Sequence, residues 1–117
     1  MSQNLYPRAT EYRVKSGSRA TLELTIQDSS GTAKSLAHTV TYSTGVWKVW
    51  KPDGTIIING AITYSDRDNG KVTYALSAAD TVVANAGNWE GEVELLNSAG
   101  VMSEQTKSFN FTIEESY

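Results

Sequence analysis

The sequence predicts an all-β domain built as an antiparallel sandwich or barrel. Apolar and polar residues alternate with a period of two along several stretches, as expected for strands with one buried and one solvated face. Clusters of Gly, Asn, Asp and Ser interrupt these stretches at intervals of roughly 8 to 12 residues. Each stretch is amphipathic rather than uniformly apolar, which favours an antiparallel sheet over a parallel sheet covered by helices.

Four stretches carry the clearest alternation. The residues expected to face a core are Ala20, Leu22, Leu24 and Ile26 in the first, Val72, Tyr74 and Leu76 in the second, Trp89, Gly91, Val93 and Leu95 in the third, and Phe109, Phe111 and Ile113 in the fourth. The third stretch then places Glu90, Glu92 and Glu94 together on the opposite face. We interpret these three glutamates as a solvated acidic stripe, which could oppose a basic partner or discourage aggregation at a sheet edge.

Two segments between the strands contain recognisable turn chemistry. In "KPDGT", Pro52, Asp53 and Gly54 predict a type I turn with a glycine bulge, closing a hairpin between Val46–Lys51 and Thr55–Asn59. In "SAADTVVANAG", Ser77 followed by Asp80 resembles a capping box, and Gly87 could end the segment. One short helical turn is therefore expected near residues 78–86.

Length and charge limit the class of protein. The 117 residues predict a single domain, 1–117, in which residues 1–10 and 114–117 lack a pattern and are expected to be flexible or ordered by a partner. A net charge of −3 argues against a protein that binds the phosphate backbone of nucleic acid. No apolar run is long enough to span a membrane, and the N-terminal residues lack the apolar region of a signal peptide. We expect folding in the cytoplasm.

Residues that carry catalytic or metal chemistry are scarce. The chain has no cysteine, and His38 is its only histidine, so a histidine-rich metal site is excluded. His38 is interpreted as a surface or loop residue. The stretch "DRDNG" places Asp66 and Asp68 at the spacing of the first two calcium ligands, but Gly70 stands where the third ligand belongs and the glutamate that would close the loop is missing. We expect a turn there, no metal, no cofactor and no enzyme.

The order of these features resembles the N-terminal domain of siphophage baseplate upper proteins and related phage tail and fibre modules. The features follow one another as a glycine before the first alternating strand, a "D…G" turn, "SL", a strand ending in "KPDGT", then "NGKVTYALSAADT", "AGNWEGEVEL" and a last strand ending in "FTI". The resemblance covers about residues 15–113. It implies an Ig-like antiparallel β-sandwich of about 7–9 strands and no catalytic residues.

The resemblance also implies a role. The expected function is that of a virion structural subunit of a baseplate, tail, neck or capsid, which docks to other virion proteins or to copies of itself as a homo-oligomer. It would be made in the bacterial host cytoplasm and located in the virion, without nucleic-acid or membrane partners. The alternative is a carbohydrate- or surface-binding module that uses exposed Trp and Tyr side chains, and a small hydrolase ranks far below both.

Two tryptophans three residues apart, Trp47 and Trp50, cannot share one face of a regular strand. In the family-like pattern, Trp47 and Val49 face the core, with Trp89 as a neighbour of Trp47 across the sandwich. Trp50 and Lys48 then face outward. Trp50 is either covered by the N-terminal arm or the loop Ala37–Gly45, or it is an assembly anchor.

The loop Ala37–Gly45 is longer than the corresponding segment of the family. Together with the two termini, it is a candidate contact surface. The candidate interface residues are therefore Trp50, Lys48, Tyr42 and His38.

Overall fold

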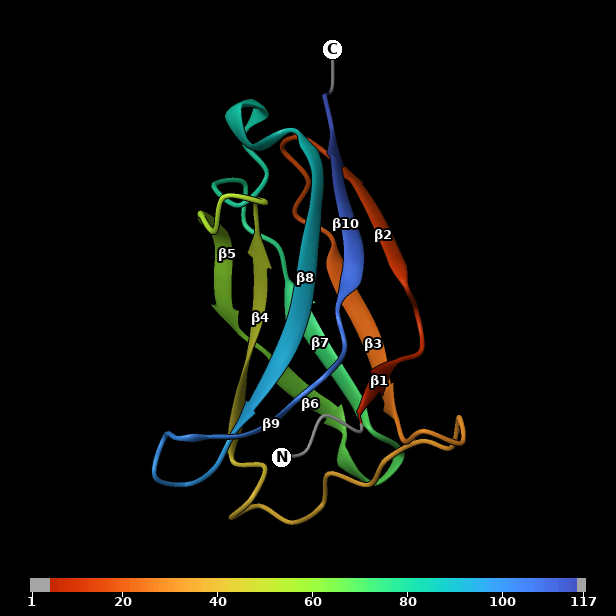
Figure 1. Ribbon diagram of the computed structural model, residues 1–117. Coiled ribbons are helices and arrows are strands. Elements are labelled where there is room, and N and C mark those ends of the chain that lie inside the picture. The colour runs from red at the N-terminus through yellow and green to blue at the C-terminus, as the bar shows by residue number, and fades with distance from the viewer. Residues whose placement is uncertain (1–4, 116–117) are drawn as a thin grey trace.

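The computed structural model describes residues 5–115, which form two β-sheets packed face to face as an Ig-like sandwich (Figure 1). The strands are β1 (Tyr6–Pro7), β2 (Glu11–Lys15), β3 (Thr21–Gln27), β4 (Thr44–Trp50), β5 (Ile56–Ala61), β6 (Thr63–Asp66), β7 (Lys71–Ala75), β8 (Gly87–Leu96), β9 (Met102–Gln105) and β10 (Phe109–Glu114). Two 3₁₀ turns, η1 (Arg67–Asn69) and η2 (Val83–Asn85), complete the fold. The predicted all-β sandwich is confirmed, and its described part has more strands than the 7–9 expected because the chain divides into short segments where it changes sheet.

The four-stranded sheet has the order β1-β3-β7-β6, and the larger sheet has the order β2-β10-β8-β4-β5, with β9 also paired to β8. The chain passes from one sheet to the other five times, and two of these connections are the shortest. One lies between β1 and β2, and the other is at Ile62 between β5 and β6. Most pairings are antiparallel as predicted, but β2 pairs with β10 in parallel, with Phe111 opposite Tyr12.

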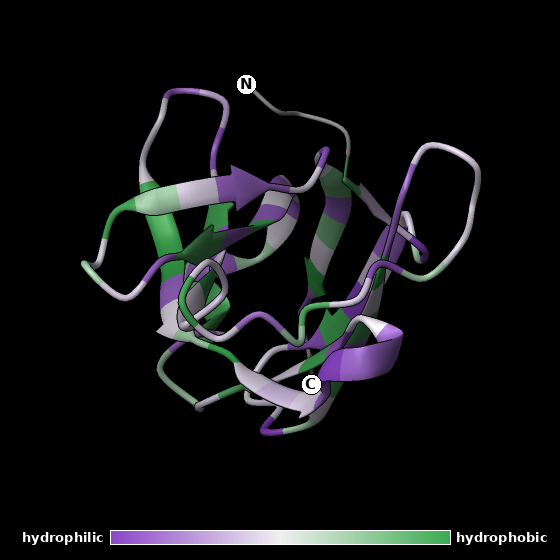
Figure 2. Ribbon diagram, turned by 90° about the horizontal axis from the view of Figure 1, so that it is seen from below, coloured by the Kyte–Doolittle hydropathy of each residue, from purple (hydrophilic) through white to green (hydrophobic). Residues whose placement is uncertain are grey.

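The core lies between the two sheets, and Figure 2 shows hydrophobic and hydrophilic bands alternating along the strands that surround it. Of the residues predicted to face inward, those that are buried are Leu24, Ile26, Val72, Tyr74, Leu76, Gly91, Val93, Leu95, Phe109, Phe111 and Ile113. Leu22 and Trp89 are partly buried and pack against this core. Alternation therefore identified the inward face correctly in all four stretches, although Ala20 itself is exposed just before β3.

Trp47 occupies the centre of the core, as predicted, and is fully buried together with Val49. The aromatic rings around it are those of Tyr12, Tyr74 and Phe109, with centroids 5.1–6.0 Å from that of Trp47. The prediction that Trp89 lies across the sandwich from Trp47 is wrong. Trp89 belongs to the same sheet as Trp47, because β8 pairs directly with β4.

Both predicted turns form with the expected chemistry. Lys51 donates its N–H to the carbonyl of Thr55, Gly54 donates to the carbonyl of Lys51, and Gly54 has a φ of 91°. In the second segment, the Ser77 N–H donates to Asp80 Oδ2 at 3.0 Å and the Asp80 N–H to Ser77 Oγ at 3.3 Å. This reciprocal pair begins a set of tight turns that ends in η2, which is the short helical element predicted near residues 78–86.

The expectation for residues 1–10 and 114–117 falls partly outside the described residues, because residues 1–4 and 116–117 are not among them. Residues 5–10 are held by the domain itself. Leu5 is 2% exposed. Pro7 pairs with Ile26 of β3, and Glu114 is the last residue of β10.

Candidate functional site

The larger sheet turns one face to the core and the other to solvent, and we call the second the outer face. Strand register aligns five residues across it in a transverse row: Ile56, Trp50, Glu90, Asn110 and Glu11. These residues come from β5, β4, β8, β10 and β2 in that order. The outer face therefore has an apolar end at β5 and β4 and a polar end at β10 and β2.

Trp50 lies on the outer face, as its spacing from the buried Trp47 predicted. Its indole is partly buried between cross-strand neighbours, Ile56 on one side and Glu90 on the other. In the N-terminal arm, Tyr6 and Pro7 pair with β3 of the smaller sheet, whereas the carbonyls of Leu5 and Thr10 accept from the N–H groups of Lys107 and Asn110. The segment Ala37–Gly45 ends in the first two residues of β4, at the opposite end of that strand from Trp50. The described part of the N-terminal arm and this loop therefore make their contacts away from Trp50.

The three glutamates of β8 do face outward together, but they are not uniformly solvated. Glu90 is exposed, whereas Glu94 forms an ion pair with Lys48, with Nζ and Oε2 3.0 Å apart and the two side chains only 27% and 17% exposed. Burial, then the hydrogen bond with Glu94 and its charge, raise the pKa of Glu92 to about 7. β8 is flanked by β10 and β4, so a role at a sheet edge does not apply.

Tyr42 and His38 lie at the far end of β4 from Trp50. Tyr42 is 7% exposed and its hydroxyl donates to Glu104 Oε1. The expectation that it is a surface contact is corrected, because the alternating pattern does not extend into this loop. His38 is exposed, and its Nδ1 accepts the Thr41 N–H at 3.2 Å, so it supports a turn.

A residue that the sequence did not single out positions the loop Ala37–Gly45. The Arg67 guanidinium donates to the carbonyls of Leu36 and Tyr42 at 3.1 and 2.7 Å. It also lies 3.9 Å from the ring centroid of Tyr64. The loop is thus fixed to the smaller sheet by a charged anchor. A lone arginine within "DRDNG" carries no local signal for that contact.

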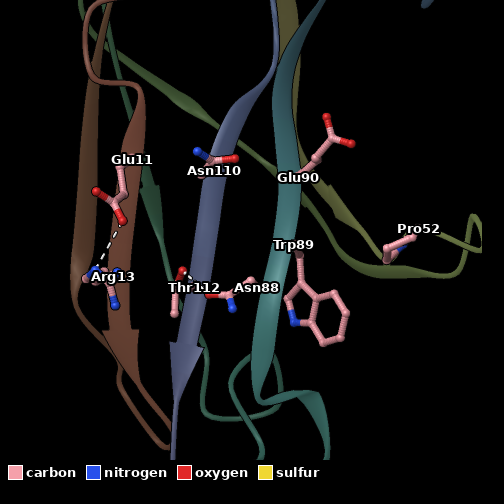
Figure 3. A pocket seen from close by; sticks show the side chains of 8 residues that line it. All are labelled: Glu11, Arg13, Pro52, Asn88, Trp89, Glu90, Asn110 and Thr112. Atoms are coloured by element: carbon pink, nitrogen blue, oxygen red, sulfur yellow. Dashed lines mark hydrogen bonds and ion pairs between the residues drawn. The ribbon is translucent and has the colours of Figure 1, made fainter.

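A pocket of about 390 Å³ opens at the polar end of the outer face (Figure 3). Its lining comes from four segments and consists of Glu11 and Arg13 of β2, Asn110 and Thr112 of β10, Asn88, Trp89 and Glu90 of β8, and Pro52 of the hairpin turn. β4 leaves the sheet after Trp50, and the Trp89 indole and Pro52 lie at that side of the pocket in Figure 3. Among the lining residues, the sequence indicated an outward-facing functional role only for Glu90, while Trp89 was expected in the core and Pro52 in a turn, because no local pattern shows which strands are neighbours.

The hydrogen bonds of the lining fix several of these side chains. Thr112 Oγ1 lies 2.8 Å from Asn88 Oδ1, and the Trp89 Nε1–H donates to the Asn85 carbonyl at 2.8 Å. Arg13 bridges Glu11 and Glu114, with both ion-pair distances 3.1 Å.

Among residues 5–115, no group of three or more His, Asp or Glu side chains is arranged to hold a metal ion. The part of the chain that the structure describes contains no helix long and apolar enough to cross a membrane.

No protein-family model matches the sequence, and no curated protein is detectably similar to it. Solved structures do match the fold. The N-terminal domain of phage TP901-1 ORF48 aligns with a TM-score of 0.67 at 13% identity, covering 87% of this chain and 82% of that one. CopC from Methylosinus trichosporium OB3b aligns with a TM-score of 0.54 at 10% identity, covering 97% and 96%. At these identities the matches establish a shared fold and leave function to be argued separately.

Proposed function

We propose that this chain is a non-enzymatic structural module of a phage virion, which acts by docking to neighbouring virion proteins and to copies of itself. The observation that supports this most is the likeness to a phage domain over 87% of the chain. The order of motifs from "KPDGT" to "AGNWEGEVEL" supports the same class. The proposed location is the virion.

The proposed docking surface is the apolar end of the outer face, formed by Trp50 and Ile56. Ile56 is 47% exposed and lies directly opposite Trp50 on the last strand of the sheet. A large indole beside an exposed isoleucine is the kind of anchor that interface cores favour. Lys48 lies two residues before Trp50 on the same face of β4 and is held by its ion pair with Glu94 of β8. It would contribute to the polar rim of the surface.

Light scattering across a concentration series tests this proposal. The wild-type protein is expected to form a homo-oligomer, and Trp50→Ala is expected to shift it toward monomer by about tenfold or more in dissociation constant. Val101→Ala serves as the control, because Val101 is also apolar and 61% exposed but lies in the turn between β8 and β9. A monomer at every concentration, or a Trp50→Ala variant that assembles normally, contradicts the proposed surface.

The genes on either side provide an independent check of the virion assignment. Neighbours that encode tail, neck or portal proteins are expected. A neighbourhood of metabolic genes would count against the virion role even if the domain self-assembles.

A further inference from the structure

We propose that the pocket at the polar end of the outer face is a binding site for a neutral sugar ring. This goes beyond the docking role, because the pocket is a separate feature from the surface at Trp50 and Ile56. Its volume of about 390 Å³ lies within the range of small-molecule sites, which begins near 300 Å³. From the sequence, carbohydrate binding is an alternative function with no located site, and the structure supplies a specific pocket for it.

Unused hydrogen-bonding capacity points into this region of the outer face. Glu90 and Asn110 stand directly opposite each other on β8 and β10, and both are exposed. Within the described part of the chain, neither side chain has a hydrogen-bond or ion-pair partner, whereas Arg13, Asn88 and Thr112 beside them are all bonded. An acceptor and an amide that both donates and accepts are therefore available side by side on paired, regular strands.

The bonded side chains of the lining keep capacity as well. If Thr112 donates to Asn88 Oδ1, the Asn88 amide nitrogen still has its two N–H groups, and the Thr112 oxygen can still accept. Arg13 has further N–H groups beyond those that contact Glu11 and Glu114. The lining thus offers donors and acceptors together within one small area.

The chemistry of the lining selects among ligand classes. Carboxylates at Glu11 and Glu90 disfavour a phosphate or another anion. A simple cation is disfavoured as well, because it would be repelled by the charge of Arg13. A second positive charge lies at the edge of the pocket, where the Lys51 ammonium is 5.3 Å from the centroid of the Trp89 ring. A hydroxyl group both donates and accepts, so a ring carrying several hydroxyls matches carboxylate, amide, guanidinium and hydroxyl partners at once.

An apolar margin completes the match. Trp89 is held in place by its bond to the Asn85 carbonyl, and Pro52 of the hairpin turn lines the pocket beside it. A sugar ring has C–H groups that can pack on such a margin while its hydroxyls face the strands. A ligand with about 12 heavy atoms in a shallow site is expected to bind with a dissociation constant on the order of 1 mM.

The test is a titration followed by two-dimensional ¹H–¹⁵N NMR, with glucose, galactose and N-acetylglucosamine as separate probes. Saturable shifts are expected for at least one sugar in the side-chain amides of Asn88 and Asn110 and the indole N–H of Trp89. Glycerol, which has hydroxyls but no ring, is expected to give no saturable shift. Absence of saturation with all three sugars overturns the proposal.

Matched variants locate the site. Asn110→Ala and Glu90→Gln are each expected to weaken binding about fivefold, as loss of one hydrogen bond does. Asn59→Ala and Glu23→Gln are the controls, because both residues are exposed and lie outside the pocket. Equal binding by wild type and Asn110→Ala overturns the assignment, and so does a preference for N-acetylarginine amide over every sugar.

This result can be separated from the docking proposal. Trp50 does not line the pocket, so Trp50→Ala is expected to keep sugar binding while losing assembly. Loss of saturable binding in Trp50→Ala would show that the two surfaces are one, which overturns the separate pocket.

Discussion

The ammonium nitrogen of Lys48 lies 3.0 Å from Oε2 of Glu94, although strand register places Glu92, not Glu94, directly opposite Lys48. The Lys48 ammonium therefore pairs diagonally across the outer face with Glu94, and it stabilises the ionised form of Glu92 less strongly. Burial, the hydrogen bond with Glu94 and the Glu94 charge raise the pKa of Glu92 from 4.5 to about 7, while Lys48 lowers it.

The first prediction concerns the pH dependence that Glu92 confers. Between its unfolded pKa of 4.5 and its folded value of about 7, the folded protein binds more protons than the unfolded chain. This contribution to stability is complete below pH 4.5 and is lost as the pH rises through 7. Because Glu92 is partly exposed, we expect a loss of only about 1 kcal/mol, which Glu92→Gln should abolish.

Urea unfolding at pH 4.5 and pH 8 measures this difference. Glu23→Gln is the control, because Glu23 is an exposed strand glutamate on the other sheet. It should keep the wild-type dependence on pH. A Glu92→Gln variant with the wild-type dependence would show that Glu92 is ionised normally in the folded protein.

The second prediction concerns Trp47. Its side chain is fully buried, and its Nε1–H has no hydrogen-bond partner in the described residues. Trp47→Ala should lower the free energy of unfolding by about 3–5 kcal/mol. Trp47→Phe should cost only about 1–2 kcal/mol, because it keeps an aromatic ring and removes the buried unpaired N–H.

Chemical denaturation of both variants measures these costs. Trp50→Ala provides the matched control three residues along the same strand, and it should cost about 1 kcal/mol or less because its indole is on the outer face. If Trp47→Phe costs as much as Trp47→Ala, the unpaired N–H is not a source of instability.

The third prediction concerns Gly60 on β5. A Cβ atom at this position would lie 2.4 Å from Cε1 of Tyr74 and 2.6 Å from its hydroxyl oxygen. That hydroxyl donates to Asp80 Oδ2 at 2.6 Å, so the ring cannot shift without stretching this bond. Gly60→Ala should therefore cost about 2 kcal/mol of stability.

A double-mutant cycle with Tyr74→Leu identifies the cause of that cost. In the Tyr74→Leu background the ring is gone, and Gly60→Ala should cost roughly 0.5 kcal/mol or less. Unfolding free energies of the four proteins complete the cycle. Equal costs in the two backgrounds would show that Gly60 is needed for its backbone conformation and not for the space it leaves to Tyr74.

Local patterns predicted much of this fold because they depend on neighbouring residues alone. Alternation placed Leu24, Val72, Val93 and Phe111 inward, since successive side chains of a strand point to opposite faces wherever the strand lies. The turn at Gly54 was predictable for the same reason. The spacing of Trp47 and Trp50 separated a core residue from an outer-face residue.

Features that depend on strand neighbours were not predictable from these patterns. Trp89 was expected across the sandwich from Trp47 and lies in the same sheet, and Tyr42 was expected at the surface and is buried. Alternation reports a face but not a partner strand, and a loop has no alternation at all.

The sequence by itself thus determined the all-β class, the inward residues of each strand and the outward direction of Trp50 and of the β8 glutamates. Only the tertiary structure decided that Glu90 lies between Trp50 and Asn110, and that β2, β10 and β8 together line a pocket. The physical reason is the separation in sequence over which each kind of interaction acts. Side-chain direction follows from local backbone geometry, whereas strand order follows from packing between segments as distant in sequence as Glu11 and Asn110.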